Sequence, residues 1–276
     1  MAIDREDYEE PRCPLGAPEG CGTGRPHGHD RPRVPMAEII AECDRLFNAE
    51  RPAELGEHLR KWRAKAREIG DEEGELSLLS ELMGHYRMTG DRERGLEAVR
   101  DGFALMAALD LGPSVSAGTI LINGATALQA FGQYDEALRH YAEAFRCYSE
   151  NLAPDDWRFA GLLNNMAAAY AAKSDFRYAE AYYRKALAVL KQCGNHMDAA
   201  VTHVNLAQMY CLTDPDDPRI TAELDLAMGE FDDPAAARDG YYAHTCRKCA
   251  SAFGFFGRPE DEAELNRRAD EFYARA

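Results

Sequence analysis

Asn165-Met-Ala-Ala-Ala-Tyr170 and Asn205-Leu-Ala-Gln-Met-Tyr210 are two copies of one pattern. A looser copy, Asn123-Gly-Ala-Thr-Ala-Leu128, comes before them at nearly the same spacing. The Asn and the Ala two places later are kept in all three copies. A repeat of this length predicts a chain of stacked helical units, because one such unit cannot bury its own apolar face.

Other positions keep the same step along the chain. Ala137, Tyr141 and Ala144 recur one repeat later as Ala, Tyr and Ala, and Gly90 and Gly132 are also one repeat apart. Small residues at fixed places predict two antiparallel helices in close contact, and the aromatic residues fill the space between units. The glycines predict a left-handed turn at the end of the first helix of a unit. The fold class is therefore all-α, and we find no alternating strand pattern.

The order Asn-Leu-Ala-x-x-Tyr, Gly, Ala, Tyr, Ala resembles the tetratricopeptide repeat. The usual period of that repeat is about 34 residues, and the period here is about 42 residues. The longer period is similar to that of the repeats of kinesin light chains and their bacterial relatives. The segment from Leu152 to Ala160 also resembles the Pro-Asp linker between those repeats. The resemblance implies a right-handed superhelical solenoid of antiparallel helix pairs with a concave side.

The composition divides the chain in two. Residues 1–35 are rich in Pro, Gly, Cys and His and predict a flexible N-terminal tail, whereas residues 36–276 are helical in pattern throughout. The repeat steps divide this second part into approximate units at 36–74, 75–116, 117–158, 159–198, 199–235 and 236–276.

The net charge and the hydropathy of the chain exclude several classes of function. The net charge of -16 opposes nucleic acid and anionic membranes, and no apolar run reaches the length of a membrane span. The acidic start MAIDREDYEE is not typical of a secretory signal. The eight cysteines are spread over the chain, many of them inside helical patterns, which is typical of reduced thiols in a cytoplasmic protein. The resemblance to bacterial relatives implies a bacterial protein.

The concave side is the expected binding surface, because in such repeats the first helix of each unit lines it. Asn side chains offer a donor and an acceptor and suit the main chain of an extended peptide, although they could instead bond between neighbouring units. Val204 and Lys248 share these helix faces. The predicted peptide-binding groove comprises Arg87, Asn123, Thr126, Asn164, Asn165, Asn205 and Gln208.

Two cysteine clusters are possible chemical sites. The N-terminal Cys13, Cys21, His27 and His29 are zinc-type ligands, but their spacing is not that of a standard finger. Cys246 and Cys249 form a CxxC inside a helical pattern, where packing is the favoured interpretation. Phosphate-binding, nucleophile-elbow and HExxH motifs are missing from the sequence, so we expect no catalytic residue, no metal and no cofactor.

The sequence thus predicts a non-enzymatic scaffold that binds a protein or peptide segment in its groove. An alternative is a bacterial regulator without a DNA-binding domain that senses a peptide or sequesters a partner. A thiol- or metal-dependent protein is the third and least favoured interpretation. The identity of the partner and the oligomeric state do not follow from the sequence.

Overall fold

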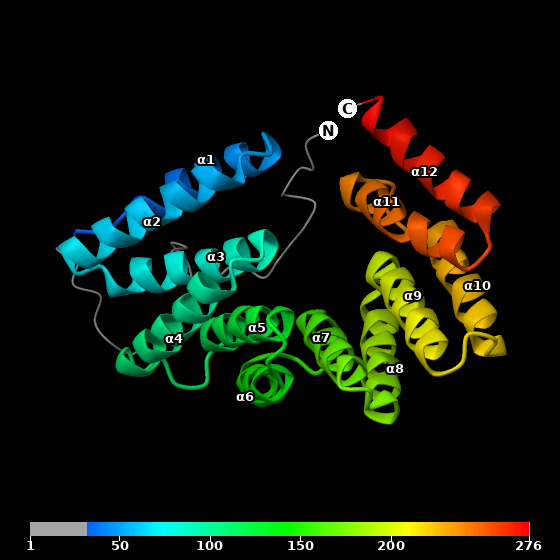
Figure 1. Ribbon diagram of the computed structural model, residues 1–276, viewed down its shortest axis with the longest axis horizontal. Coiled ribbons are helices and arrows are strands. Elements are labelled where there is room, and N and C mark those ends of the chain that lie inside the picture. Colours follow the sequence, from blue (N-terminus) through cyan, green and yellow to red (C-terminus); the bar gives the residue numbers. More distant parts are fainter. Residues whose placement is uncertain (1–31, 276) are drawn as a thin grey trace. The chain divides into compact units, whose positions relative to one another are not determined.

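The computed structural model describes residues 32–275, and within that range the chain forms twelve α-helices and no strand. This confirms the predicted all-α class. Within the described range, residues 32–153 and residues 154–275 form two compact units, called unit 1 and unit 2 below. Figure 1 shows the helices of each unit following one another as antiparallel neighbours.

Unit 1 contains the first six helices. Its two regular hairpins join α3 to α4 and α5 to α6, and α5 also packs on α3. The helices of unit 1 are α1 (Met36–Asn48), α2 (Pro52–Ile69), α3 (Glu72–Thr89), α4 (Arg92–Ala108), α5 (Val115–Ala130) and α6 (Tyr134–Asn151).

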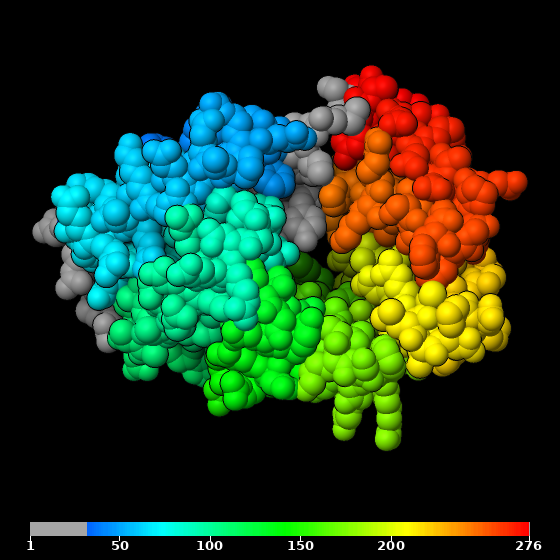
Figure 2. Space-filling view, in the orientation of Figure 1, coloured from blue at the N-terminus to red at the C-terminus, as the bar shows by residue number. Residues whose placement is uncertain are grey.

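Unit 2 contains three hairpins, and the first helix of each packs on the first helix of the next. In the space-filling view the second and third hairpins, yellow and orange to red, make one continuous surface (Figure 2). The helices of unit 2 are α7 (Arg158–Ala172), α8 (Phe176–Cys193), α9 (His196–Thr213), α10 (Pro218–Asp232), α11 (Gly240–Phe255) and α12 (Pro259–Tyr273).

The turn between the helices of a pair repeats with the sequence. Gly90 has a φ of 71° and Gly132 a φ of 80°, as the glycine spacing predicts. Ser174, one repeat further on, has a φ of 62°. A left-handed backbone at a serine is unfavourable, so the fold imposes this turn even where the sequence lacks glycine.

The repeated small and aromatic residues form the core of both units. Ala125, Ala167 and Ala207 are fully buried on successive first helices. Tyr141 and Tyr183 are buried on second helices, each between two buried alanines one turn away. These buried positions confirm that the repeated residues of the sequence are those that pack one helix against the next.

A buried ionic cluster holds α9 against its neighbours. Glu223 of α10 is 3% exposed and receives Arg184 of α8 at 2.5 Å and Nδ1 of His203 of α9 at 2.7 Å. Arg184 also donates to the hydroxyl of Tyr210 at 3.1 Å. Although burial opposes it, these two partners hold the pKa of the Glu223 carboxyl below its usual value. The face of α9 that carries His203 and Tyr210 therefore packs against α8 and α10 inside unit 2.

The N-terminal boundary of the fold lies inside the predicted tail. Val34 is 6% exposed, and its N–H donates to Oδ2 of Asp71 at 2.9 Å. Asp71 also accepts from the N–H of Gly74 at 3.0 Å as the N-cap of α3. The residues just before α1 thus pack on the start of α3.

Candidate peptide-binding surface

In unit 1, the predicted groove residue Asn123 makes a contact between helix pairs. Its Nδ2 on α5 donates to Oγ of Ser80 on α3 at 2.8 Å. Ser80 is buried, so this bond satisfies a polar group that water does not reach. Asn123 therefore fits the interpretation in which an asparagine bonds between neighbouring helix pairs.

Thr126 lies against the hydroxyl of the buried Tyr141, and the charge of Arg87 acts on the same hydroxyl. Thr126 Oγ1 lies 3.1 Å from that hydroxyl, which donates to Oε1 of Gln129 at 2.9 Å. Burial raises the pKa of Tyr141, and the charge of Arg87 opposes the rise. The structure thus brings Arg87, Thr126 and Gln129 together around one phenol inside unit 1.

In unit 2, Asn164 also has an internal partner. Its Nδ2 donates to Oγ1 of Thr202 at 2.9 Å, and Thr202 donates in turn to the carbonyl of Asp198 at 2.7 Å. Thr202 is completely buried on α9. Asn164 therefore links α7 to α9 and has less capacity for a ligand.

Asn165 and Asn205 differ from their neighbours. Both side chains are half-buried, and neither amide has a hydrogen-bond partner within residues 32–275. An amide has two donor hydrogens and an acceptor oxygen. These two asparagines can therefore bind a main chain without losing an internal bond.

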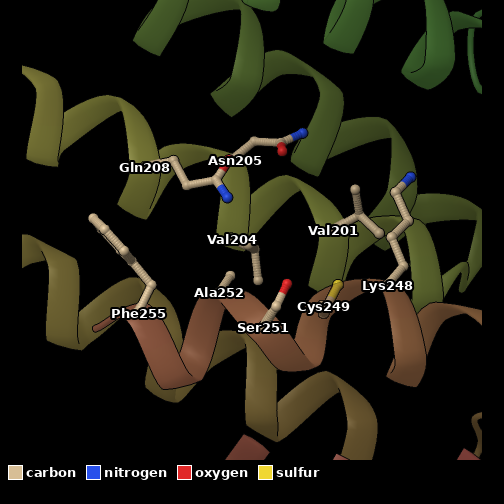
Figure 3. A pocket seen from close by; sticks show the side chains of 9 residues that line it. All are labelled: Val201, Val204, Asn205, Gln208, Lys248, Cys249, Ser251, Ala252 and Phe255. Atoms are coloured by element: carbon tan, nitrogen blue, oxygen red, sulfur yellow. The ribbon is translucent and has the colours of Figure 1, made fainter. Parts of the chain in front are cut away.

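A pocket between α9 and α11 contains Asn205 and Gln208 of the predicted groove. Its volume is about 330 Å³, near the lower end of small ligand sites. Figure 3 shows side chains from the two helices pointing into the space between them. The pocket is lined by Val201, Val204, Asn205, Gln208, Lys248, Cys249, Ser251, Ala252 and Phe255.

Four of these residues were not predicted from the sequence, namely Val201, Ser251, Ala252 and Phe255. Phe255 is 76% exposed, although it is a large apolar side chain. The signal that could have found Ala252 and Phe255 was helical spacing, since they lie one and two turns after Lys248. The repeat is degenerate in this part of the chain, so these positions cannot be aligned with those of the other first helices.

The two ends of the pocket differ in polarity. Lys248 lies at one end and Phe255 at the other, with the amides of Asn205 and Gln208 along α9 (Figure 3). Lys248 is exposed and has no carboxylate partner among the described residues. One turn earlier on α11, burial and then the charge of Lys248 lower the pKa of His244.

The CxxC cysteines belong to the packed side of α11. Cys246 and Cys249 are both buried, and burial raises their thiol pKa values to about 11 and about 12. A thiol that stays protonated at neutral pH is a poor nucleophile and a poor metal ligand. Within residues 32–275, the His, Cys, Asp and Glu side chains form no group of three that could hold a metal ion. The other candidate cluster, Cys13, Cys21, His27 and His29, lies outside the described residues.

No helix in the described part of the chain is long and apolar enough to cross a membrane.

Two sequence models of the tetratricopeptide repeat match the chain, at residues 118–157 and residues 158–217. No curated protein matches it.

Solved structures share the fold at low sequence identity. The repeats of a putative kinesin light chain from Podosopora anserina are 17% identical, with 71% of this chain and 94% of that chain covered and a TM-score of 0.51. BtubC (BKLC) from P. vanneervenii is 18% identical, with coverages of 88% and 92% and a TM-score of 0.54. A Rap protein complexed with Competence and Sporulation Factor is 12% identical, with coverages of 86% and 65% and a TM-score of 0.54.

The matched repeats coincide with the residue columns that pack the helices, and the neighbouring structures have the same helical-repeat architecture. Residues 118–217 therefore consist of tetratricopeptide repeats, and the described residues share the helical-repeat fold of these solved structures.

Proposed function

We propose that this protein is a non-enzymatic scaffold that holds a peptide or protein segment on the first helices of its repeats, with the α9–α11 pocket as the main contact. The observation that carries the proposal is the pair of accessible amides in unit 2. Asn165 and Asn205 have no internal partner among the described residues, while Asn164 beside them has one. Amides without an internal bond are available to a peptide main chain.

The architecture supports this role. Stacked helical repeats present extended surfaces that bind other proteins, and tetratricopeptide repeats support a protein-interaction scaffold. The pocket adds a place for one side chain beside the amides. The proposal adds that Asn165, Asn205 and Gln208 bind the main chain of this segment.

The cysteines favour a scaffold over a thiol enzyme. Cys246 and Cys249 are buried with raised pKa values, so neither supplies a thiolate at neutral pH. The proposal therefore assigns no catalytic residue and no cofactor. It also places the protein in the bacterial cytoplasm, with a protein or peptide partner rather than nucleic acid or membrane.

A regulator without a DNA-binding domain is the second candidate. It is favoured by the likeness of fold to a Rap protein solved in complex with Competence and Sporulation Factor. A regulator would hold a partner protein and release it when a peptide binds. Affinity capture of the full chain from the native cell, followed by addition of a peptide that binds the chain, separates the two candidates. A scaffold keeps its partner protein when the peptide is added, whereas a regulator releases it.

A displayed peptide library tests the proposed function directly. Panning a random library on the full chain should enrich peptides whose affinity falls at least about tenfold in the variant Asn205→Ala/Gln208→Ala. The matched control is Gln192→Ala, which removes an exposed amide from α8. If no peptide is enriched, or if all enriched peptides bind the double variant as tightly as the wild type, the proposal fails.

A further inference from the structure

The accessible positions on one face of α9 carry no charge. Val201, Asn205, Gln208 and Leu212 follow one another at helical spacing and are half-buried or exposed. Leu212 is 70% exposed. At such positions a soluble protein ordinarily has Asp, Glu, Lys or Arg, because charged side chains are the usual surface residues.

The same stripe is repeated on α7, one repeat earlier in the chain. Gly161, Asn165, Ala168 and Ala172 occupy the matching places and are also half-buried or exposed. We call these four residues and the four on α9 the neutral face.

The lack of charge belongs to this face and not to unit 2 as a whole. The second helices α8 and α10 each contain five charged residues, whereas α7 and α9 contain one each, near the start of the helix. Burial accounts for the uncharged residues of α7 and α9 that face the core, but not for those of the neutral face, whose eight positions are half-buried or exposed. The protein as a whole has a net charge of -16, so an uncharged accessible face is unusual for it.

The pocket beside the neutral face has both apolar and polar lining residues. Val201 and Val204 line it from α9, and Ala252 and Phe255 line it from α11. Lys248 is its one charged lining residue, and this side chain is exposed at the end of the pocket away from Phe255 (Figure 3). An exposed charge pair contributes about 1 kcal/mol at most, so Lys248 alone does not select an acidic partner.

We infer that the segment bound in unit 2 is uncharged, with one large apolar side chain in the α9–α11 pocket and its main chain on Asn205 and Gln208. This inference rests on the proposed function and names the class of partner. A charged side chain placed on the neutral face would lose water without gaining an opposite charge. An uncharged segment gains the apolar contact and the amide hydrogen bonds without that loss. Its binding is also insensitive to the field of the acidic protein.

Capped amino acid amides test the inference on the full chain. The probes are N-acetyl-leucinamide and N-acetyl-phenylalaninamide, which are neutral, and the N-acetyl amides of aspartate and lysine, which carry one charge. The readout is the methyl NMR signals of Val201 and Val204 during titration. The neutral probes should shift these signals at concentrations at least about tenfold lower than the charged probes do. Raising NaCl from about 0.05 M to about 0.5 M should change the neutral probes' affinity less than about twofold.

Two variants act as controls. Ser251→Trp fills the pocket from an exposed position and should abolish the shifts, whereas Gln192→Ala, on α8 and outside the pocket lining, should leave the neutral probes' affinity within about twofold. Tighter binding of the aspartate probe, lost in Lys248→Gln, would overturn the inference, and so would neutral probes that leave both valines unshifted. Library peptides that depend on Asn205 and Gln208 but are charged would keep the proposed function and refute the uncharged partner.

Discussion

Asn164 and Thr202 join two first helices of unit 2 through a side-chain hydrogen bond of 2.9 Å, and Thr202 is completely buried. Asn165, the next residue on α7, has no such partner among the described residues. The two side chains are one residue apart, about 100° of helical rotation, and only the amide of Asn164 has a hydrogen-bond partner among the described residues. The same substitution should therefore change the stability of the protein at Asn164 and leave it nearly unchanged at Asn165.

Asn164→Ala should lower the free energy of unfolding by about 1 kcal/mol, because it removes the hydrogen bond to buried Thr202. Asn165→Ala should change it by less than about 0.5 kcal/mol, as is usual for surface changes. Urea titrations of the two variants and the wild type measure both values. Equal losses would show that Asn165 also has a packing role, and its assignment to the binding surface would be withdrawn.

Removal of a repeated core tyrosine should destabilise the fold strongly. Tyr183 is 4% exposed, and burial raises its pKa to about 12. Tyr183→Ala should therefore cost about 3–5 kcal/mol, the range for losing a buried aromatic side chain. Tyr178 on the same helix is 54% exposed and provides the control, because Tyr178→Ala should cost less than about 1 kcal/mol. Similar midpoints of urea unfolding for both variants would contradict the repeat assignment.

The repeat could be predicted from the sequence because the packing of the helices has the same period as the sequence. Ala125, Ala167 and Ala207 are buried at one geometric place, and the turn at Ser174 keeps the conformation of Gly90 and Gly132. Such repeated positions can be recognised in a single sequence, because every copy has to pack its two helices in the same way.

The roles of individual polar residues could not be predicted in that way. Asn123, Asn165 and Asn205 share a sequence column, yet within the described residues only Asn123 bonds to a serine on a neighbouring first helix. Asn123 has this bond because Ser80 lies opposite it on α3, and the repeated asparagine position alone does not predict that serine. Phe255 was missed because α11 lies in a part of the chain where the repeat is degenerate.

Stability should fall in acid because His85 is held in its neutral form. Burial, and then the charge of Arg60, lower its pKa, while Asp91 opposes the shift. A histidine with a depressed pKa in the folded state binds fewer protons than the unfolded chain does. Its contribution is thus complete above the unfolded pKa of about 6.5 and is lost as the pH falls through the lower folded pKa.

The measurement is the urea midpoint of wild type and His85→Asn at pH values from about 8 to about 5. The difference between the two proteins removes the contribution of the carboxyl groups, which also weaken the fold in acid. The wild type should lose more stability than the variant below about pH 6.5. Parallel curves would mean that His85 does not titrate differently on folding.

Thiol labelling should separate the exposed cysteine from the CxxC pair. Cys193 is exposed, whereas Cys246 and Cys249 are buried with raised pKa values. Brief iodoacetamide treatment of the folded chain, followed by peptide mass mapping, should modify Cys193 and leave both CxxC thiols intact until urea unfolds the protein. Rapid modification of Cys246 or Cys249 would instead favour the thiol-dependent interpretation of the sequence.

The double variant Asn165→Ala/Asn205→Ala tests the central claim most directly, with affinity for the tightest library peptide measured by titration calorimetry. Both amides lack internal partners in the described structure, so the melting temperature should stay that of the wild type. Each polar group of the peptide left without its asparagine partner costs about 1–3 kcal/mol, so the affinity should fall at least about tenfold, or 1.4 kcal/mol. An unchanged affinity together with a lowered melting temperature would contradict the account, because both asparagines would then be structural and the partner would bind elsewhere.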